Sequence, residues 1–213
     1  MSTEKANIHN QLLQVATDLS VALESAIAQN GPIELPVNTT SSLPKHPYAE
    51  RTFPERLCRA VTGQQLSVRA AETIWQRVVA SAGETPLMDH FAQVDPSGLK
   101  SCGLSRAKVK TVSAIAHAYL NGQLNATELS QLSHAERTTR LTTIWGIGQW
   151  TADMMGIFYF GDPDIWPEGD VTARKTLENL TSKRRKTIRT ATRFAPYRSY
   201  LALHMWKHVD ATP

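Results

Sequence analysis

Apolar residues recur at helical spacing along nearly the whole chain, and alternating strand patterns are almost absent. The clearest sets are Leu12, Leu13, Ala16, Leu19, Leu23 and Ile27; Leu57, Ala60 and Val61; and Ala71, Ile74, Val78 and Val79. This spacing predicts an all-α fold of about ten short helices. We expect the first helix to end near Gly31-Pro32, and an irregular connection rich in Pro, Ser, Thr and Asn to continue to Pro47.

Proline, acidic and glycine residues mark the ends of several of these helices. Asp95-Pro96 and Thr85-Pro86 are typical of helix starts, with Pro at the first helical position. Glycines follow three of the apolar helical patterns and predict where those helices end: Gly83, Gly103 and Gly122.

Length and composition exclude several classes of protein. A chain of 213 residues can form one compact domain, or two small lobes, without a disulfide or metal staple. With 41% hydrophobic and 20% charged residues, it is ordinary for a soluble globular protein. No apolar run could span a bilayer, and residues 1–10 lack a signal-peptide core, so secretion is not expected. Cys58 and Cys102 cannot form a four-thiolate metal site, and we expect two reduced core thiols.

Positive charge is concentrated at the C-terminal end of the sequence. Residues 171–213 hold ten lysines and arginines against two acidic residues, whereas residues 1–50 and 51–170 are each net negative. This asymmetry favours a polyanionic partner, and it favours nucleic acid over a membrane because the segment lacks a strongly amphipathic apolar face. A solvated basic surface without a ligand is the alternative.

Residues 141–150 read Leu-Thr-Thr-Ile-Trp-Gly-Ile-Gly-Gln-Trp and predict a helix end, a Gly-x-Gly turn and a new helix. Gly146 and Gly148 would let the backbone approach a ligand, and the free N–H groups of the second helix would form a site for one phosphate. A helical hairpin that binds nothing would use a similar turn. Two polar segments add context: residues 62–67, and an irregular loop at residues 161–169 that ends in Asp170.

These segments, in this order, resemble the helix-hairpin-helix (HhH-GPD) DNA glycosylase superfamily. Within it, the chain resembles the AlkA-type 3-methyladenine DNA glycosylases, also called glycosylase II. The matching segments are residues 53–67, 103–108, 146–152, 195–200 and 204–206. The resemblance implies an all-helical, two-lobed fold with the active site in the cleft between the lobes. It also implies a helix and irregular connection in residues 1–50, packed with the C-terminal lobe, and a glycosylase domain in residues 51–213 with its hairpin at 141–155.

The implied activity is hydrolysis of the N-glycosidic bond of alkylated bases, of the 3-methyladenine and 7-methylguanine type, in duplex DNA. The damaged nucleotide would be flipped out of the helix, as in base excision repair. Asp170 matches the catalytic aspartate, whose charge would stabilise the oxocarbenium-like transition state; it would also N-cap the following helix. Trp150 stands where bifunctional relatives carry a Schiff-base lysine, so no strand cleavage is expected.

The resemblance also assigns binding positions. Base-pocket positions fall on Trp150, Trp206, Met154 and Val171, and core packing is the alternative for each tryptophan. DNA-binding positions fall on Gln65, Ser67, Gly146, Gly148 and Thr151. Gln65 would enter the gap left by the flipped nucleotide and Ser67 would probe the minor groove, whereas Gln64 is expected to be structural.

One cation site and no other cofactor is implied. The backbone carbonyls of Thr142, Ile144 and Ile147 match positions that hold a monovalent cation, Na⁺ or K⁺, in relatives, although Trp145 stands where proline is usual. No iron–sulfur cluster is expected. We expect a monomer that binds double-stranded DNA with alkylated or abasic sites and no membrane. It would act in the bacterial cytoplasm at the nucleoid, or in the nucleus of a eukaryote.

A run of basic residues and a pair of histidines lie outside these assignments. The run Lys183-Arg184-Arg185-Lys186 follows Ser182, which predicts four cations in the first turn of a helix, where the dipole disfavours them. Hydration of this run is expected ahead of phosphate contact or a nuclear localisation signal. His204 and His208 lie one turn apart, but structural roles are favoured because no further metal ligands accompany them.

The alternative function is a catalytically silent reader of abasic or distorted DNA. Departures from the family pattern at Trp145 and Met154 favour it, and the presence of Asp170 favours the enzyme.

Overall fold

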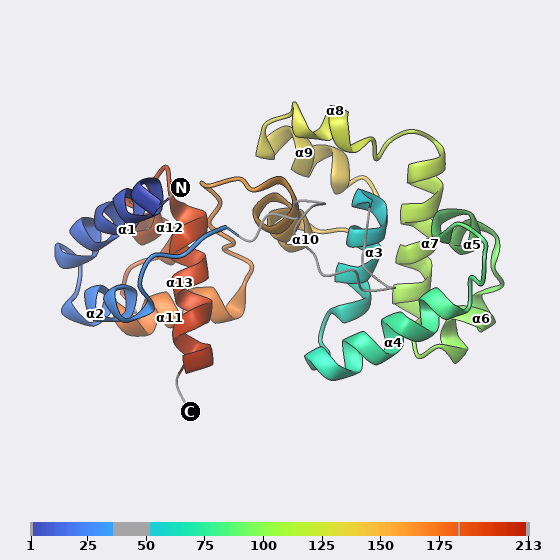
Figure 1. Cartoon of the computed structure of the whole chain (residues 1–213), viewed down its shortest axis with the longest axis horizontal. Helices are drawn as coiled ribbons and strands as arrows, with labels where there is room; N and C mark the ends of the chain where they lie inside the picture. The colour runs from blue at the N-terminus through green and yellow to red at the C-terminus, as the bar shows by residue number, and fades with distance from the viewer. Residues whose placement is uncertain (1, 36–51, 183, 212–213) are drawn as a thin grey trace. The chain divides into compact units, whose positions relative to one another are not determined.

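The computed structural model describes residues 2–35, 52–182 and 184–211, and all regular structure in these ranges is helical (Figure 1). The all-α prediction is therefore confirmed. The chain divides into two compact units, one formed by Met1–Val37 with Asp153–Pro213 and the other by Asn38–Ala152. Within the described ranges, no helix combines the length and apolarity that crossing a membrane requires.

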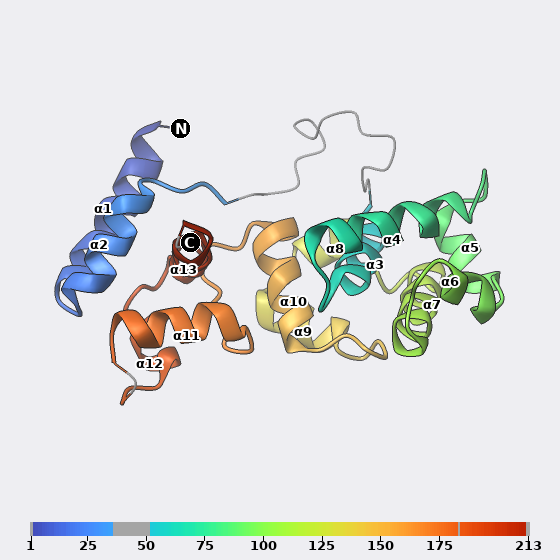
Figure 2. The ribbon, with the colours of Figure 1, turned by 90° about the horizontal axis from the view of Figure 1, so that it is seen from below.

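The first unit joins the N-terminal helices to the end of the chain. Its elements are α1 (Ser2–Thr17), α2 (Val21–Asn30), the π-helical η1 (Gly156–Phe160), α11 (Val171–Leu180), α12 (Thr187–Thr192) and α13 (Arg198–Ala211). α13 is seen end-on in Figure 2, with α2 and α11 beside it. Leu12 and Leu23 share a core with Leu177 and Leu201, all of them fully buried or nearly so. Residues distant in sequence therefore build one core.

The second unit is a continuous stretch of chain. Its elements are α3 (Phe53–Gly63), α4 (Val68–Ala80), α5 (Leu87–Gln93), α6 (Pro96–Ser101), α7 (Arg106–Leu120), α8 (Ala126–Ser130), α9 (His134–Leu141) and the start of α10 (Gln149–Met155). α3 buries Phe53, Leu57 and Val61, which recur every four residues and form one apolar stripe. α7 packs against both α3 and α5. Cys58 and Cys102 are buried free thiols, as predicted.

The single N-terminal helix expected from the apolar spacing is wrong, because α1 and α2 are two helices. The chain turns after Thr17, and the Ser20 hydroxyl caps α2 by accepting from the backbone N–H of Ala22 at 3.2 Å. The second helix does end at Gly31, whose φ is +65°. The described ranges hold thirteen α-helices and one π-helical segment, more than the ten or so that the spacing predicts. Apolar spacing continues across such a break, so spacing alone does not reveal it.

The predicted helix at the basic run is also wrong. α12 begins only at Thr187, with Lys186 at its N-cap position, and Arg184 and Arg185 lie in the turn before it. The Ser182 hydroxyl accepts from the backbone N–H of Arg184 at 3.3 Å, so it shapes this turn instead of capping a helix. Lys183 and Pro47 lie outside the described residues.

Other predicted boundaries agree with the structure to within three residues. Asp95 caps α6, with Pro96 as its first residue, and its carboxylate accepts from the backbone N–H of Ser97 at 2.8 Å. α5 begins at Leu87, so Pro86 occupies the N-cap position and not the first helical position. The predicted stop glycines, Gly83, Gly103 and Gly122, all have positive φ.

Candidate functional site

Asp170 lies at the end of the irregular loop and N-caps α11. Its Oδ1 atom accepts from the backbone N–H of Ala173 at 2.8 Å and from the indole Nε1–H of Trp206 at 3.0 Å. The residue remains partly exposed. The cap that the sequence predicts is therefore present, and a second donor from α13 fixes the carboxylate group.

Trp206 is held on its other side by an aromatic ring. Phe158 of η1 stacks on it, with ring centroids 5.6 Å apart and ring planes at 29°. Val171 follows Asp170 and is 52% exposed. In the first unit, the Asp170 carboxylate thus contacts the Trp206 indole, which Phe158 supports by stacking, and the exposed Val171 is the next residue in the chain. Sequence reasoning missed Phe158, although an aromatic run directly after the hairpin helix was a readable signal.

The other two predicted base-pocket residues lie on α10. Met154 is 7% exposed, which favours a packing role for its side chain. Trp150 is half-buried and belongs to the second unit.

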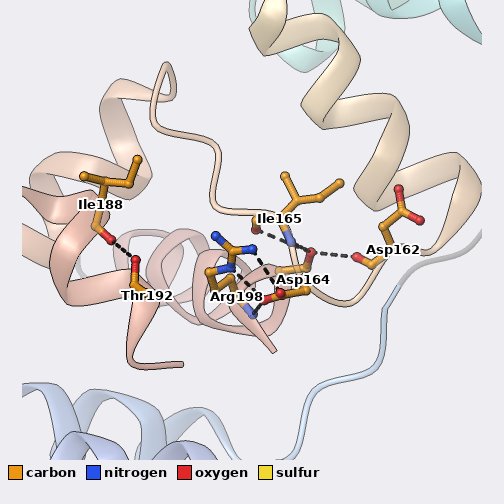
Figure 3. A network of polar contacts seen from close by, with 7 residues as sticks. Asp162, Asp164, Ile165, Ile188, Thr192 and Arg198 are labelled. Carbon is orange, nitrogen blue, oxygen red and sulfur yellow. Dashed lines mark hydrogen bonds and ion pairs between the residues drawn. The ribbon is translucent and has the colours of Figure 1, made fainter. Parts of the chain in front are cut away.

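The loop that leads to Asp170 is tied to the start of α13 (Figure 3). Arg198 makes a bidentate ion pair with Asp164, at 2.7 and 2.9 Å. The hydrogen bonds that the guanidinium donates to Asp164 raise the pKa of Arg198. The Ser199 hydroxyl donates to the carbonyl of Asp162 at 2.6 Å and accepts from the backbone N–H of Ile165 at 2.9 Å. These contacts give the segment 195–200, which the sequence matches to the family, a structural role.

Glu168 ties the same loop to α12. Its carboxylate accepts from the indole Nε1–H of Trp166 at 2.6 Å and from the Thr187 hydroxyl at 2.8 and 2.9 Å. Thr187 and Trp166 are both buried, at 3% and 7% exposure. A charge-assisted hydrogen bond to a buried partner contributes about 1.5–3 kcal/mol. The backbone two residues before Asp170 is therefore fixed from two sides, which the sequence alone did not reveal.

The predicted hairpin is present, with α9 and α10 joined by residues 142–148, and its turn belongs to the second unit. Gly146 has φ +84°, and a Cβ atom there would lie 2.1 Å from Oγ1 of Thr111. The fold itself therefore requires glycine at this position. Gly148 is different, because a Cβ atom there would meet nothing within 4 Å. The open space over Gly148 is what the close approach of a ligand would need.

Trp145 is exposed beside this turn. Its side chain is 46% accessible, and Nζ of Lys110, on α7, lies 4.1 Å from the ring centroid. A cation over an indole face at this distance is a favourable contact of about 0.5–1 kcal/mol at an exposed site. Trp145, which stands where proline is usual in the family it resembles, thus presents an aromatic surface beside the positive charge of Lys110.

The loop between α3 and α4 places Gln65 on the surface in a strained conformation. Gln65 is exposed and has φ +59°, an uncommon value for a residue other than glycine. The Lys108 ammonium holds the loop by donating to the carbonyls of Thr62 at 2.9 Å and Gln64 at 2.7 Å. Burial of this ammonium lowers the pKa of Lys108. Two segments that the sequence analysis singled out, residues 62–67 and 103–108, therefore meet.

Thr151 joins the hairpin to that loop. Its side chain is 3% exposed, and its hydroxyl accepts from the amide of Gln64 at 3.2 Å. The structural role expected for Gln64 is confirmed. A DNA contact through the Thr151 side chain is not supported, because the hydroxyl is buried and already paired. Ser67 caps α4, with its hydroxyl accepting from the backbone N–H of Ala70 at 3.3 Å.

His204, one of the two histidines that lie one turn apart on α13, has a structural environment. His204 is 1% exposed and its ring lies 5.7 Å from that of His9. Burial, with smaller contributions from His9 and Lys207, lowers the pKa of His204 to about 3. Among the described residues, no group of three or more His, Cys, Asp or Glu side chains could hold a metal ion.

Comparison with known proteins identifies relatives of this arrangement. The family model described as "HhH-GPD superfamily base excision DNA repair protein" matches residues 58–195. The chain is 32% identical over 171 residues to DNA-3-methyladenine glycosylase 1 of Schizosaccharomyces pombe, covering 76% of this chain and 72% of that protein. It is 30% identical over 162 residues to DNA-3-methyladenine glycosylase 2 of Escherichia coli, covering 71% of this chain and 56% of that one.

A solved structure also matches this chain along nearly its whole length. The 3-methyladenine DNA glycosylase of Schizosaccharomyces pombe, in complex with abasic DNA, matches with a TM-score of 0.75 at 26% identity. The match covers 97% of this chain and 98% of that one.

Proposed function

The chain belongs to the HhH-GPD superfamily of base excision DNA repair proteins, and we propose that it is a monofunctional DNA glycosylase acting on alkylated bases. Its substrates would be N-alkylated purines of the 3-methyladenine and 7-methylguanine type in duplex DNA. The observation that carries this proposal is Asp170, a partly exposed carboxylate oriented by two hydrogen bonds at the end of a tethered loop.

Asp170 would act through its charge. Breaking the N-glycosidic bond leaves positive charge on the deoxyribose C1′ and ring oxygen, and a carboxylate held nearby stabilises that transition state. Opposite unit charges about 4 Å apart attract by about 4 kcal/mol at an effective dielectric constant near 20. The base leaves with the electron pair of the broken bond, and water then adds to C1′ and loses a proton, which leaves an abasic site. Because the two donors to Oδ1 stay in place during the reaction, the carboxylate needs no reorganisation.

Trp206 and Phe158 supply aromatic surface for the base. An N-alkylated purine is cationic, and an electron-rich indole face attracts cations without demanding one hydrogen-bond pattern. The cationic base also leaves as a neutral molecule, so the reaction needs no strong general acid. This chemistry fits alkylated bases better than neutral lesions, which need protonation to leave.

The hairpin and the Gln65 loop would bind the DNA. The open backbone at Gly148 would receive one phosphate, and Gln65 would enter the space left by the flipped nucleotide. Insertion of a polar side chain recovers part of the few kcal/mol that unstacking costs. Lys108 would keep the strained loop in position by holding its two carbonyls.

A monovalent cation at the hairpin is part of this proposal. Thr142, Ile144 and Ile147 would hold it through their backbone carbonyls, and the buried Ile144 and Ile147 side chains fix that backbone. The Ile144 carbonyl also accepts from the N–H of Ile147 at 3.1 Å, which leaves it one lone pair for a cation. The donor set of neutral oxygens therefore suits Na⁺ or K⁺, whose charge would attract the phosphate.

Trp150 argues against lyase activity, because an indole cannot form a Schiff base with the sugar. The product would then be an intact abasic site. We further propose that the protein acts as a monomer on DNA in the compartment that holds the genome.

The test is release of free bases from methylated duplex DNA. The wild-type protein should release 3-methyladenine or 7-methylguanine, and Asp170→Asn should lower the rate by about 10³-fold, which corresponds to about 4 kcal/mol. The asparagine Oδ1 can still accept from Ala173 and Trp206, so folding and DNA affinity should change little. If Asp170→Asn stays within about tenfold of wild type, the carboxylate is not the catalytic group. If the wild type binds abasic DNA and releases no base, the protein is a silent reader.

A further inference from the structure

The segment before α12 and the exposed side of α12 form a hollow of about 440 Å³. Its lining is Arg184, Arg185, Lys186, Arg189, Thr190 and Arg193. Five of these six side chains are cationic, and all six belong to the first unit. We call this feature the basic hollow. The turn of the hairpin, residues 142–148, belongs to the second unit.

Most of the positive charge in the basic hollow has no counter-charge within the described part of the chain. Arg193 forms an ion pair with Asp18 at 3.3 Å, and both side chains are largely exposed, so this pair neutralises little. No ion pair involves Arg184, Arg185, Lys186 or Arg189 in the described ranges. Like charges around one hollow repel each other, and a multivalent anion would relieve that repulsion.

The chemistry of the lining points to phosphate groups. Four of the five cations are arginines, whose planar guanidinium donates two parallel hydrogen bonds to a phosphate. The turn at Ser182 and the start of α12 hold the backbone that carries them. Within the described part of the run, Arg184 and Arg185 precede the helix and Lys186 occupies its N-cap position, so the dipole disfavours fewer cations than the sequence predicts. Arg189 and Arg193, which follow the run, face the same hollow.

The position of the basic hollow links it to Asp170. Lys186 is next to Thr187, whose hydroxyl donates to Glu168 at 2.8 Å, and Glu168 is two residues from Asp170. The start of α12 is therefore joined to the loop that carries Asp170, and a duplex bound at Asp170 would present its flanking phosphates to the same unit. Successive phosphates of one strand are about 3.4 Å apart along the duplex axis, so a cluster of five cations could contact more than one of them.

We propose that the basic hollow binds phosphates of the DNA backbone that flank the damaged nucleotide, as a second anchor besides the hairpin. This inference rests on the proposed function, because it assigns a DNA contact to the same complex. It replaces the sequence-based expectation that the run is hydrated surface.

The test compares two double variants with equal loss of charge. Arg184→Gln with Arg189→Gln empties the basic hollow of two cations, and Lys5→Gln with Lys100→Gln removes two cations elsewhere. Affinity for a fluorescent duplex that carries an abasic analogue is measured by anisotropy at several salt concentrations. The hollow variant should bind at least tenfold more weakly at low salt, with a log–log salt slope shallower by about 1–2, since each phosphate contact contributes about 0.9. The control variant should stay within about threefold of wild type.

A second arm tests position. Trimming the duplex on the side that meets the basic hollow should weaken the wild type and leave the hollow variant unchanged. Circular dichroism verifies that both variants fold, and Arg185→Gln repeats the comparison with a single change. Equal affinities of the two double variants would overturn the inference and leave hydration or an import receptor as the role of the run. Base release by the wild type is measured in parallel. If the wild type releases bases while the two double variants bind equally, only the inference about the basic hollow fails; if the wild type releases no base, the proposed function fails as well.

Discussion

Mild acid should destabilise this protein because it buries a neutral histidine pair. His204 lies on α13 and is 1% exposed, and its ring faces that of His9 from α1. Burial lowers the pKa of His204 to about 3, with repulsion from His9 and Lys207 adding to it, and burial also lowers the pKa of His9. The Asn30 amide of α2 donates to the His204 carbonyl, at 3.1 Å, and so leaves the ring unaffected.

The sign follows from proton binding in the two states. The unfolded chain takes up a proton on His204 near its ordinary pKa of 6.5, whereas the folded protein resists protonation until about pH 3. Between these values the unfolded state binds more protons, so the free energy of unfolding falls as the pH falls. The slope approaches about 1.4 kcal/mol per pH unit, which gives a loss of about 2 kcal/mol at pH 5. That is a large fraction of a typical total of about 5–15 kcal/mol.

Urea unfolding at pH 7.5, 6.5, 5.5 and 5.0 measures this slope. His204→Leu removes the titrating group from an apolar site and should flatten the dependence, although it changes stability at every pH. His117→Gln, at an exposed position on α7, is the control and should retain the wild-type slope. If wild type and His204→Leu lose stability in parallel between pH 6.5 and 5, the burial argument is wrong.

Three further outcomes follow from the site. Gly146→Ala should lower the midpoint of thermal unfolding, because it strains a backbone with positive φ, whereas Gly148→Ala should leave that midpoint unchanged and weaken binding to all duplexes alike. The hairpin assignment would be contradicted if calorimetry showed the lower unfolding midpoint for Gly148→Ala and anisotropy showed that this variant binds duplexes as well as wild type. Borohydride reduction should trap no covalent adduct, since Trp150 offers no amine; any protein–DNA adduct would refute this. Trp206→Phe keeps an aromatic ring but removes the donor to Asp170, and it should slow base release by about tenfold, since such a hydrogen bond is worth about 1.5–3 kcal/mol. An unchanged single-turnover rate would show that the indole does not orient the carboxylate.

Local chemistry explains which parts of the fold could be predicted. The cap at Asp95, the positive-φ glycines and the Asp170 cap each depend on a few adjacent residues, and each is present as predicted. The break between α1 and α2 escaped prediction because apolar spacing continues across it. The basic run was misplaced because Ser182 has the chemistry of a cap but supports a turn before α12.

The side chains that hold the candidate site in place were beyond prediction for another reason. Lys108 supports the Gln65 loop from 44 residues away, and Ser199 supports the Asp162 carbonyl from 37 residues away. Such contacts depend on tertiary packing, which no local pattern encodes. The family resemblance identified these segments as important, and the structure adds which atoms they contact.

The shared core of the first unit has a consequence for the newly made chain. α1 and α2 leave the ribosome early, but Leu201 and Met205, which help to cover them, are made about 170 residues later. At about 5–20 residues per second, the apolar faces of the first two helices wait roughly 10 to 30 s for their partners. During that interval Leu12, Leu23 and Ile27 are available to chaperones or to other nascent chains. Truncation before α13 would make that exposure permanent, so loss of a short C-terminal segment should harm the opposite end of the protein first.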